Sequence, residues 1–273
     1  MAGQKIAGYP FRPAIPRTKP TINSKPTFYD FPLKTGETIV IPQTSPTQST
    51  FPNLVKNKLS FILTLSTLAI SSLFADDTKT GLHLVFSEDF EKGVGRWEPT
   101  DPKGWTHREI EKNHVYGINA RKNNYKPEVR SPYHIALIKD IKLSDFTLTF
   151  RVRSTKDTGN HRDCCVFFNH QDPTHFYYVH LGARPDPHSG QIMIVNGAPR
   201  KALTENKNNV PWDNEWHQVK VQRDSKKGTI EIFFDDMKKP IMTATDKTFG
   251  KGRIGIGSFD DMNDFDDIKL WGR

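Results

Sequence analysis

Cysteine is nearly absent from this chain of 273 residues, which contains only Cys164 and Cys165. Neighbouring side chains of a β-strand point to opposite faces, so a disulfide between these adjacent residues would require a distorted turn. We therefore expect two free thiols. The chain has no disulfide framework, and a domain of about 200 residues does not need one.

Long apolar runs are also scarce, and the clearest one, residues 59–70, is short for a membrane span of about 20 residues. The basic residues Lys56 and Lys58 precede this run, and the small residue Ala75 follows it just before two aspartates. That order is typical of a signal peptide, which we predict at residues 55–75. The protein is then secreted or periplasmic, and the alternative is an uncleaved membrane anchor.

Residues 1–53 carry nine of the 19 prolines and show no sustained apolar periodicity, which predicts a disordered segment. Signal peptides lie at the N-terminus of a chain, so we infer that residues 1–54 result from a start codon placed too early. A natural peptide from this segment would contradict that inference. The folded part is expected to be a single domain, residues 76–273.

The excess of positive charge is confined to the part that export would remove. Residues 1–75 hold eight of the 39 basic and two of the 31 acidic residues, so residues 76–273 carry 31 basic and 29 acidic side chains, a net charge of about +2. A nucleic-acid partner is not expected, because it would require a basic face on the folded domain. No membrane span is expected after cleavage of the signal peptide.

Helical periodicity is missing from residues 82–273, which break into short β-rich segments separated by Gly, Pro, Asn and Asp. In residues 145–153, every second residue from Phe146 to Val152 is apolar, and the residues between them, including Arg151 and Arg153, are polar. This spacing predicts one face in the core and one in solvent. No internal repeat is evident, so a propeller or solenoid is disfavoured. We predict an all-β fold of two packed antiparallel sheets, with strands at residues 82–90, 107–118, 133–141, 145–153, 164–170, 174–182, 190–196, 216–223, 228–235, 240–245, 252–259 and 265–271.

Several of these segments resemble a known superfamily. Residues 216–224 (WHQVKVQRD) and 228–236 (GTIEIFFDD) resemble paired strands of laminin G-like and concanavalin A-like lectin/glucanase domains. Residues 86–91 with Trp97, and residues 265–271, resemble the terminal strands of the same domains. The resemblance covers residues 82–273 and implies a concanavalin A-like jelly roll that acts on carbohydrate.

Within that superfamily, Gly159 and Asn160 followed by residues 166–168 (VFF) are similar to a pattern of the 3-keto-disaccharide hydrolase family. Residues 91–96 replace the asparagine-glycine that this family has ahead of the tryptophan, and residues 176–182 (FYYVHLG) replace its acidic strand. The resemblance therefore implies the fold rather than the reaction.

Five of the ten histidines lie within residues 161–188, among tyrosines, arginines and aspartates. Such a mixture suits sugars, whose rings offer an apolar face and a rim of hydroxyl groups. In the expected strand 174–182, Tyr178 and His180 share one face. We predict that they line a concave, solvent-facing sheet with Arg151 or Arg153, and act as acid and base in a lyase-type elimination. The alternative is an ordinary solvated sheet face.

His161 and Asp163 flank Arg162 in an expected loop, where a base and its carboxylate partner could be held together for catalysis. A loop salt bridge is the alternative. His188 and Arg200 lie beside turn signals and are expected at the rim of a glycan site. No pair of carboxylates suited to glycoside hydrolysis is evident.

Acidic residues near both ends of the domain offer oxygen ligands for calcium, and the terminal strands are expected to pair. We predict a structural Ca²⁺ there, and acidic turn residues at a sheet edge are the alternative. Its ligands would be Glu88, Asp89, Asp266 and Asp267. Zinc is disfavoured, because no HExxH motif occurs and His175 and His180 are expected on opposite faces of one strand.

Three functions remain open from the sequence. The domain binds a poly- or oligosaccharide, or it is a glycoside hydrolase or polysaccharide lyase with a His/Tyr/Arg site, or it is a laminin G-like protein-interaction domain. We predict a secreted protein that binds or processes an extracellular glycan.

Overall fold

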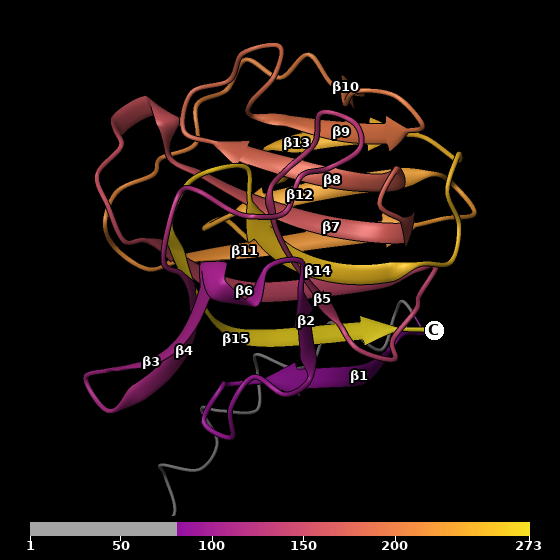
Figure 1. The fold of residues 1–273 in the computed structure, drawn as a ribbon. Coiled ribbons are helices and arrows are strands. Elements are labelled where there is room, and N and C mark those ends of the chain that lie inside the picture. The colour runs from indigo at the N-terminus through magenta and orange to yellow at the C-terminus, as the bar shows by residue number, and fades with distance from the viewer. Residues whose placement is uncertain (1–80) are drawn as a thin grey trace, which may run out of the picture. The chain divides into compact units, whose positions relative to one another are not determined.

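The computed structural model describes residues 81–273. The segment expected to be disordered and the predicted signal peptide lie outside these residues. The described chain forms two antiparallel β-sheets that pack face to face (Figure 1). The predicted two-sheet β-sandwich is thus confirmed.

The eight-stranded sheet has the order β13-β12-β11-β6-β15-β4-β3, and β1 pairs with the C-terminal part of β15. The seven-stranded sheet has the order β10-β9-β8-β7-β14-β5-β2. The strands of the first sheet are β1 (His83–Glu88), β3 (Trp105–Ile110), β4 (Asn113–Ile118), β6 (Phe146–Ser154), β11 (His217–Asp224), β12 (Thr229–Phe234), β13 (Met242–Thr245) and β15 (Asn263–Gly272). Those of the second are β2 (Trp97–Pro99), β5 (His134–Ile138), β7 (Asp163–Asp172), β8 (His175–Gly182), β9 (Gln191–Asn196), β10 (Lys201–Ala202) and β14 (Arg253–Ser258).

The predicted strands agree with the observed ones except in three places. Residues 107–118 form the hairpin β3–β4 rather than one strand, because Glu111 and Lys112 adopt positive φ angles of 53° and 69° and turn the chain. The short strands β2 and β10 were not predicted. Both lie at edges of the seven-stranded sheet.

The main core lies between the two sheets. Phe146, Leu148, Phe150 and Val152 of β6 all lie in it, as their alternation predicted. Cys164 also belongs to this core, whereas the adjacent Cys165 points to the other face of β7. Both thiols are free and buried, which confirms the prediction for the cysteines.

The seven-stranded sheet is covered on both sides. Its face away from the main core, which we call the outer face, carries a second apolar cluster. The segment between β4 and β5 packs against that face through Tyr125, Val129 and Tyr133. The buried members of this second cluster are Ile135, Leu137, Cys165, Phe167, Phe176, Tyr178, Met193, Val195 and Phe259.

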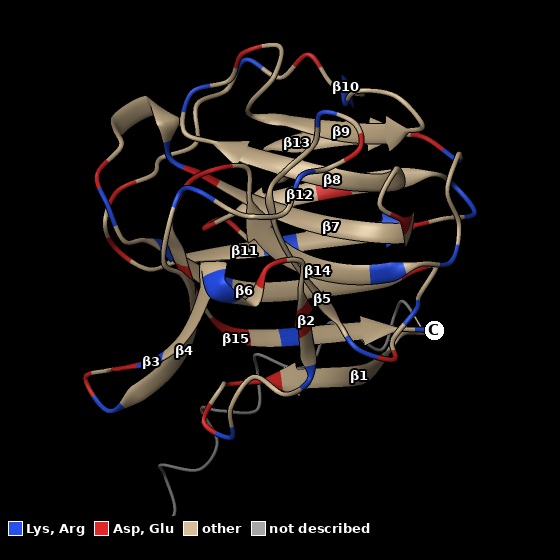
Figure 2. Ribbon diagram, in the orientation of Figure 1, with Lys and Arg blue, Asp and Glu red and all other residues tan. Residues whose placement is uncertain are grey.

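Charged residues of both signs are interspersed along the loops in the view of Figure 2. Within residues 81–273, no helix is long and apolar enough to cross a membrane.

Candidate functional site

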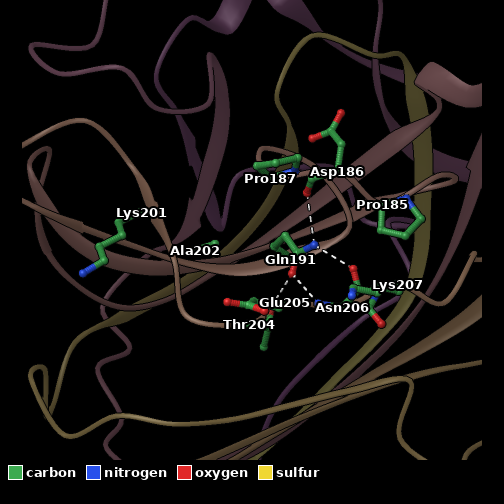
Figure 3. A pocket seen from close by; sticks show the side chains of 10 residues that line it. All are labelled: Pro185, Asp186, Pro187, Gln191, Lys201, Ala202, Thr204, Glu205, Asn206 and Lys207. Carbon is green, nitrogen blue, oxygen red and sulfur yellow. Dashed lines mark hydrogen bonds between the residues drawn. The ribbon is translucent and has the colours of Figure 1, made fainter.

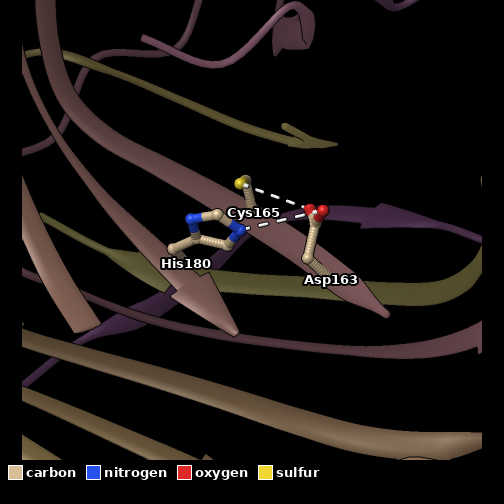
Figure 4. A group of neighbouring side chains, drawn as sticks. All are labelled: Asp163, Cys165 and His180. Carbon is tan, nitrogen blue, oxygen red and sulfur yellow. Dashed lines mark hydrogen bonds and ion pairs between the residues drawn. The ribbon is translucent and has the colours of Figure 1, made fainter. Parts of the chain in front are cut away.

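Cross-strand register brings polar side chains together on the outer face. Cys165 on β7 lies opposite His180 on β8, and His180 lies opposite Gln191 on β9. Asp163 precedes Cys165 by two residues and therefore points to the same face. The side chains of Asp163, Cys165 and His180 meet as a buried cluster, drawn in Figure 4.

Asp163 is the best-connected member of this cluster. Its Oδ1 atom accepts hydrogen bonds from the Ser258 hydroxyl at 2.8 Å and from the backbone N–H of Phe259 at 2.9 Å. Its Oδ2 atom lies 3.7 Å from Nε2 of His180, and Sγ of Cys165 lies 4.0 Å from Oδ1. Burial raises the pKa of Asp163, but His180 and these hydrogen bonds outweigh burial and hold the pKa below its usual value. Asp163 is therefore ionised at neutral pH.

Tyr178 and Arg200 extend this polar group along the outer face. Tyr178 is 0 % exposed, and its hydroxyl has no hydrogen-bond partner among the described residues. The Arg200 guanidinium lies 4.1 Å from the centre of the Phe259 ring, and its Nε and Nη1 atoms are likewise without a partner in residues 81–273. Burial raises the pKa of Tyr178 well above its usual value. The tyrosine is thus uncharged at neutral pH.

The expectation that Tyr178 and His180 face solvent is wrong. Both are buried, because the segment between β4 and β5 and the Phe259 ring cover the outer face. The expected pairing of His161 with Asp163 is also wrong, since Asp163 pairs with His180 and His161 is exposed in the 3-10 turn Gly159–His161. The role of Tyr178 and His180 as acid and base stays a prediction.

Arg151 and Arg153 do not adjoin Tyr178, contrary to expectation, because β6 belongs to the other sheet. Their guanidinium groups stack on Trp216, at 5.0 and 5.1 Å from its ring centre. Arg153 pairs with Asp264 at 3.1 Å, and Arg151 pairs with Asp266 at 2.8 Å. A glycan-binding role for these arginines would therefore place the glycan on the opposite side of the sandwich.

The residues predicted to bind calcium each contact protein groups. Glu88 pairs with Arg96 at 3.0 Å, and Asp266 and Asp267 lie 2.8 and 2.7 Å from Arg151. The expected pairing of the terminal strands is observed between β1 and β15. In residues 81–273, the one group of three or more potential metal ligands is Asp163, Cys165 and His180. Calcium at Glu88, Asp89, Asp266 and Asp267 stays a prediction.

An open pocket of about 570 Å³ is lined by residues of β9, of β10 and of the segments next to them (Figure 3). Its residue Gln191 lies opposite His180 of the buried cluster. Gln191 organises the pocket: its amide N–H group donates to the carbonyl oxygens of Asp186 and Asn206, and its Oε1 accepts from Thr204 and from the backbone N–H of Asn206. We call it the edge pocket. Its lining residues are Pro185, Asp186, Pro187, Gln191, Lys201, Ala202, Thr204, Glu205, Asn206 and Lys207.

Both predicted rim residues are next in sequence to lining residues of the edge pocket. His188 follows Pro187 and is exposed, and Arg200 precedes Lys201. The lining segment 201–207 itself was not singled out in the sequence, because it holds no motif. The one sequence signal near the edge pocket is the pair of turn motifs at residues 186–188 and 198–200.

Acidification from pH 6.5 to pH 4 is expected to destabilise the fold through His170. Burial, reinforced by Arg253, lowers the pKa of His170 to about 4, whereas an unfolded histidine titrates near 6.5. As the pH falls, the unfolded chain therefore binds the proton first. The contribution of neutral His170 to the free energy of unfolding is complete above pH 6.5 and is lost as the pH falls towards 4. The loss amounts to about 3 kcal/mol.

Urea unfolding of the protein and of His170→Gln at pH 7.5 and pH 4.5 measures this contribution. At pH 7.5, the difference in unfolding free energy between the parent and the variant reports the packing lost against Phe176. The His170 imidazole stacks on the Phe176 ring with 5.0 Å between the ring centres. The variant should lose less stability than the parent between the two pH values. Equal losses would show that His170 does not carry the effect.

Comparison with known proteins finds likenesses of structure only. No family model matches the chain, and no characterised protein sequence matches it. The carbohydrate-binding module CBM66 from Bacillus subtilis is 16% identical with a TM-score of 0.47, covering 64% of this chain and 94% of that one.

Two further solved structures are similar. Domain 4 of AbnA, a GH43 extracellular arabinanase from Geobacillus stearothermophilus, is 9% identical with a TM-score of 0.45, covering 70% of this chain and 93% of that one. The cellulose induced protein Cip1 is 13% identical with a TM-score of 0.46, covering 68% and 96%. Values this low transfer no ligand or activity to this chain.

Proposed function

We propose that this domain binds carbohydrate and that the glycan lies in the edge pocket. The observation that carries the proposal is the pocket itself, which has about 570 Å³ of open space and hydrogen-bonding side chains at seven of its ten lining residues. Pockets of about 300–1,000 Å³ are typical of small-molecule sites. An oligosaccharide segment fits that size class.

The lining suits a ligand rich in hydroxyl groups. Asp186 and Glu205 offer carboxylate acceptors, and Lys201 and Lys207 offer ammonium donors. A sugar hydroxyl both donates and accepts, so it can use groups of either kind. Pro185, Pro187 and Ala202 add small apolar surfaces between these groups.

The lining is also partly preformed. The four hydrogen bonds of Gln191 span 2.7–3.1 Å and tie the turn at Asp186 to residues 204–206. A site held in this way loses less conformational entropy when a ligand binds.

The alternative functions have less support from the structure. A lyase or hydrolase that uses Tyr178 and His180 must reach side chains that are 0 % and 5 % exposed. A protein-interaction surface would need a large apolar patch, and the large exposed hydrophobic residues of the described chain are Leu84 and Val85 on β1. Export by the predicted signal peptide, residues 55–75, would bring the domain to extracellular glycans and is part of this proposal.

Replacing Lys201 and Glu205 together by alanine is expected to weaken glycan binding at least about tenfold. Each substitution removes a charged group whose hydrogen bond to the glycan would contribute about 1.5–3 kcal/mol to the binding free energy. The ligand is first found by screening the full-length protein on a polysaccharide panel, read for retention and for new reducing or unsaturated ends. Titration calorimetry then gives the affinity of the protein and of the double variant.

The double variant Lys239→Ala/Glu109→Ala is the matched control, since it removes one charge of each sign from exposed positions that do not line the pocket. It should bind as the parent does. Retention by no glycan on the panel would contradict the proposal. New reducing or unsaturated ends would favour the enzyme instead.

A further inference from the structure

Asp163, Cys165 and His180 bring three potential metal ligands to one point of the outer face (Figure 4). Their oxygen, sulfur and nitrogen atoms all lie within 4.8 Å of one another, and all three side chains are buried. We propose that these residues bind a zinc ion. The site is distinct from the edge pocket, so either proposal can fail without the other.

The backbone holds these ligands in place. Asp163 and Cys165 are two residues apart on β7 and point to one face, while His180 comes from the position opposite Cys165 on β8. Both strands lie inside the sheet, between β14 and β9. His175 packs edge-on against Phe249 of the main core, on the other face of β8, and takes no part.

The ligand distances are close to those of a zinc centre. With zinc bonds of about 2.0–2.3 Å in a tetrahedron, ligand atoms lie roughly 3.4–3.6 Å apart. Nε2 of His180 lies 3.7 Å from Oδ2 of Asp163, and Sγ of Cys165 lies 4.0 Å from Oδ1. Because the three ligand atoms all lie within 4.8 Å of one another, shifts of up to about 1 Å would close the site around the ion.

The donor set selects the metal. A thiolate, an imidazole and a carboxylate are ligands that zinc takes, whereas calcium and magnesium prefer oxygen atoms alone. When Zn²⁺ binds, the Cys165 thiol would release its proton to solvent, and the resulting thiolate together with the Asp163 carboxylate would balance the charge of the ion, so the buried site would be neutral overall. Three protein ligands leave a fourth position for a small molecule such as water.

Groups around the ligands also support this assignment. The Ser258 hydroxyl and the Phe259 N–H both bond Oδ1 of Asp163, which leaves Oδ2 directed at His180. Hydrogen bonds of this kind orient ligating carboxylates in metal sites. The competing explanation is a buried Asp–His ion pair with a bystander thiol.

Cys164 provides a matched control for the test, because it is the adjacent thiol, equally buried, and faces the main core. The full-length protein, purified without chelators and dialysed against zinc, is expected to hold one zinc per chain by elemental analysis. Cys164→Ser should keep that zinc. Cys165→Ser and His180→Phe should each bind zinc at least about 100-fold more weakly, since loss of a mere supporting group costs about 10–100-fold.

Cobalt provides a second measurement, which needs no variant that could fail to fold. Co²⁺ in place of zinc should give the sulfur-to-metal charge-transfer absorption of a thiolate ligand, and Cys164→Ser should retain it. Folded parent protein that takes up neither metal would overturn the proposal. Equal zinc contents in Cys164→Ser and Cys165→Ser would also overturn it.

Discussion

Replacing Arg223 by methionine is expected to lower the free energy of unfolding by about 3–5 kcal/mol. Arg223 is 3 % exposed and points from β11 into the space between the sheets. Its guanidinium donates to the carbonyl oxygens of Gly228, Asp246 and Phe249 at 2.7, 2.9 and 3.2 Å. Methionine fills a similar volume, but it leaves the carbonyl groups of Asp246 and Phe249 without this donor, while the Gly228 carbonyl keeps only the backbone N–H of Asp246.

Urea unfolding followed by tryptophan fluorescence measures the loss. Arg184→Met makes the same chemical change at an exposed position and should shift stability by no more than about 0.5 kcal/mol. If Arg223→Met unfolded within about 1 kcal/mol of the parent, water or a rearranged loop would be satisfying the carbonyl groups.

Arg223 also illustrates what local patterning cannot show. It occupies a core-facing position of β11, in register with Phe146 on β6, where the alternation alone predicts an apolar residue. Its acceptors lie in the turn at Gly228 and in the segment 246–249, which are brought together only by the folded sandwich. From the sequence alone, a charged residue at such a position cannot be assigned to the core, because most of the groups that bond it are far away in the chain.

The fold was predictable because alternation on β6 is a local property. Phe146 to Val152 face the core and Arg151 and Arg153 face away, as the period of two requires. On β8 the period placed Tyr178 and His180 on one face correctly. The prediction that this face is exposed to solvent was wrong. The segment between β4 and β5 covers it, and this segment precedes β8 by about 50 residues and has no sequence pattern that indicates where it packs.

The candidate sites were less predictable than the fold for the same reason. Asp163 and Cys165 share a face by spacing alone, but His180 joins them only through the register of β7 with β8. The edge pocket depends on Gln191, whose four hydrogen bonds reach residues on both sides of it in sequence. Neither arrangement leaves a motif in the chain.

Gly257→Ala is expected to destabilise the protein by more than about 3 kcal/mol, or to prevent folding. Gly257 lies on β14, which runs between β5 and β7. A Cβ atom at this position would lie 1.9 Å from the carbonyl oxygen of His134, a backbone atom of the neighbouring strand. Because main-chain atoms cannot rotate away as a side chain can, β14 and β5 would have to separate.

The matched control is Gly95→Ala, where an added Cβ would have no neighbouring atom within 4 Å. It should leave the free energy of unfolding within about 0.5 kcal/mol of that of the parent. Gly257 also lies opposite Cys165 and precedes Ser258, whose hydroxyl orients Asp163. If Gly257→Ala folds, its zinc affinity should therefore fall as well, while that of Gly95→Ala should not. Parent-like stability in Gly257→Ala would mean that β5 and β14 are packed less closely than the His134 contact requires.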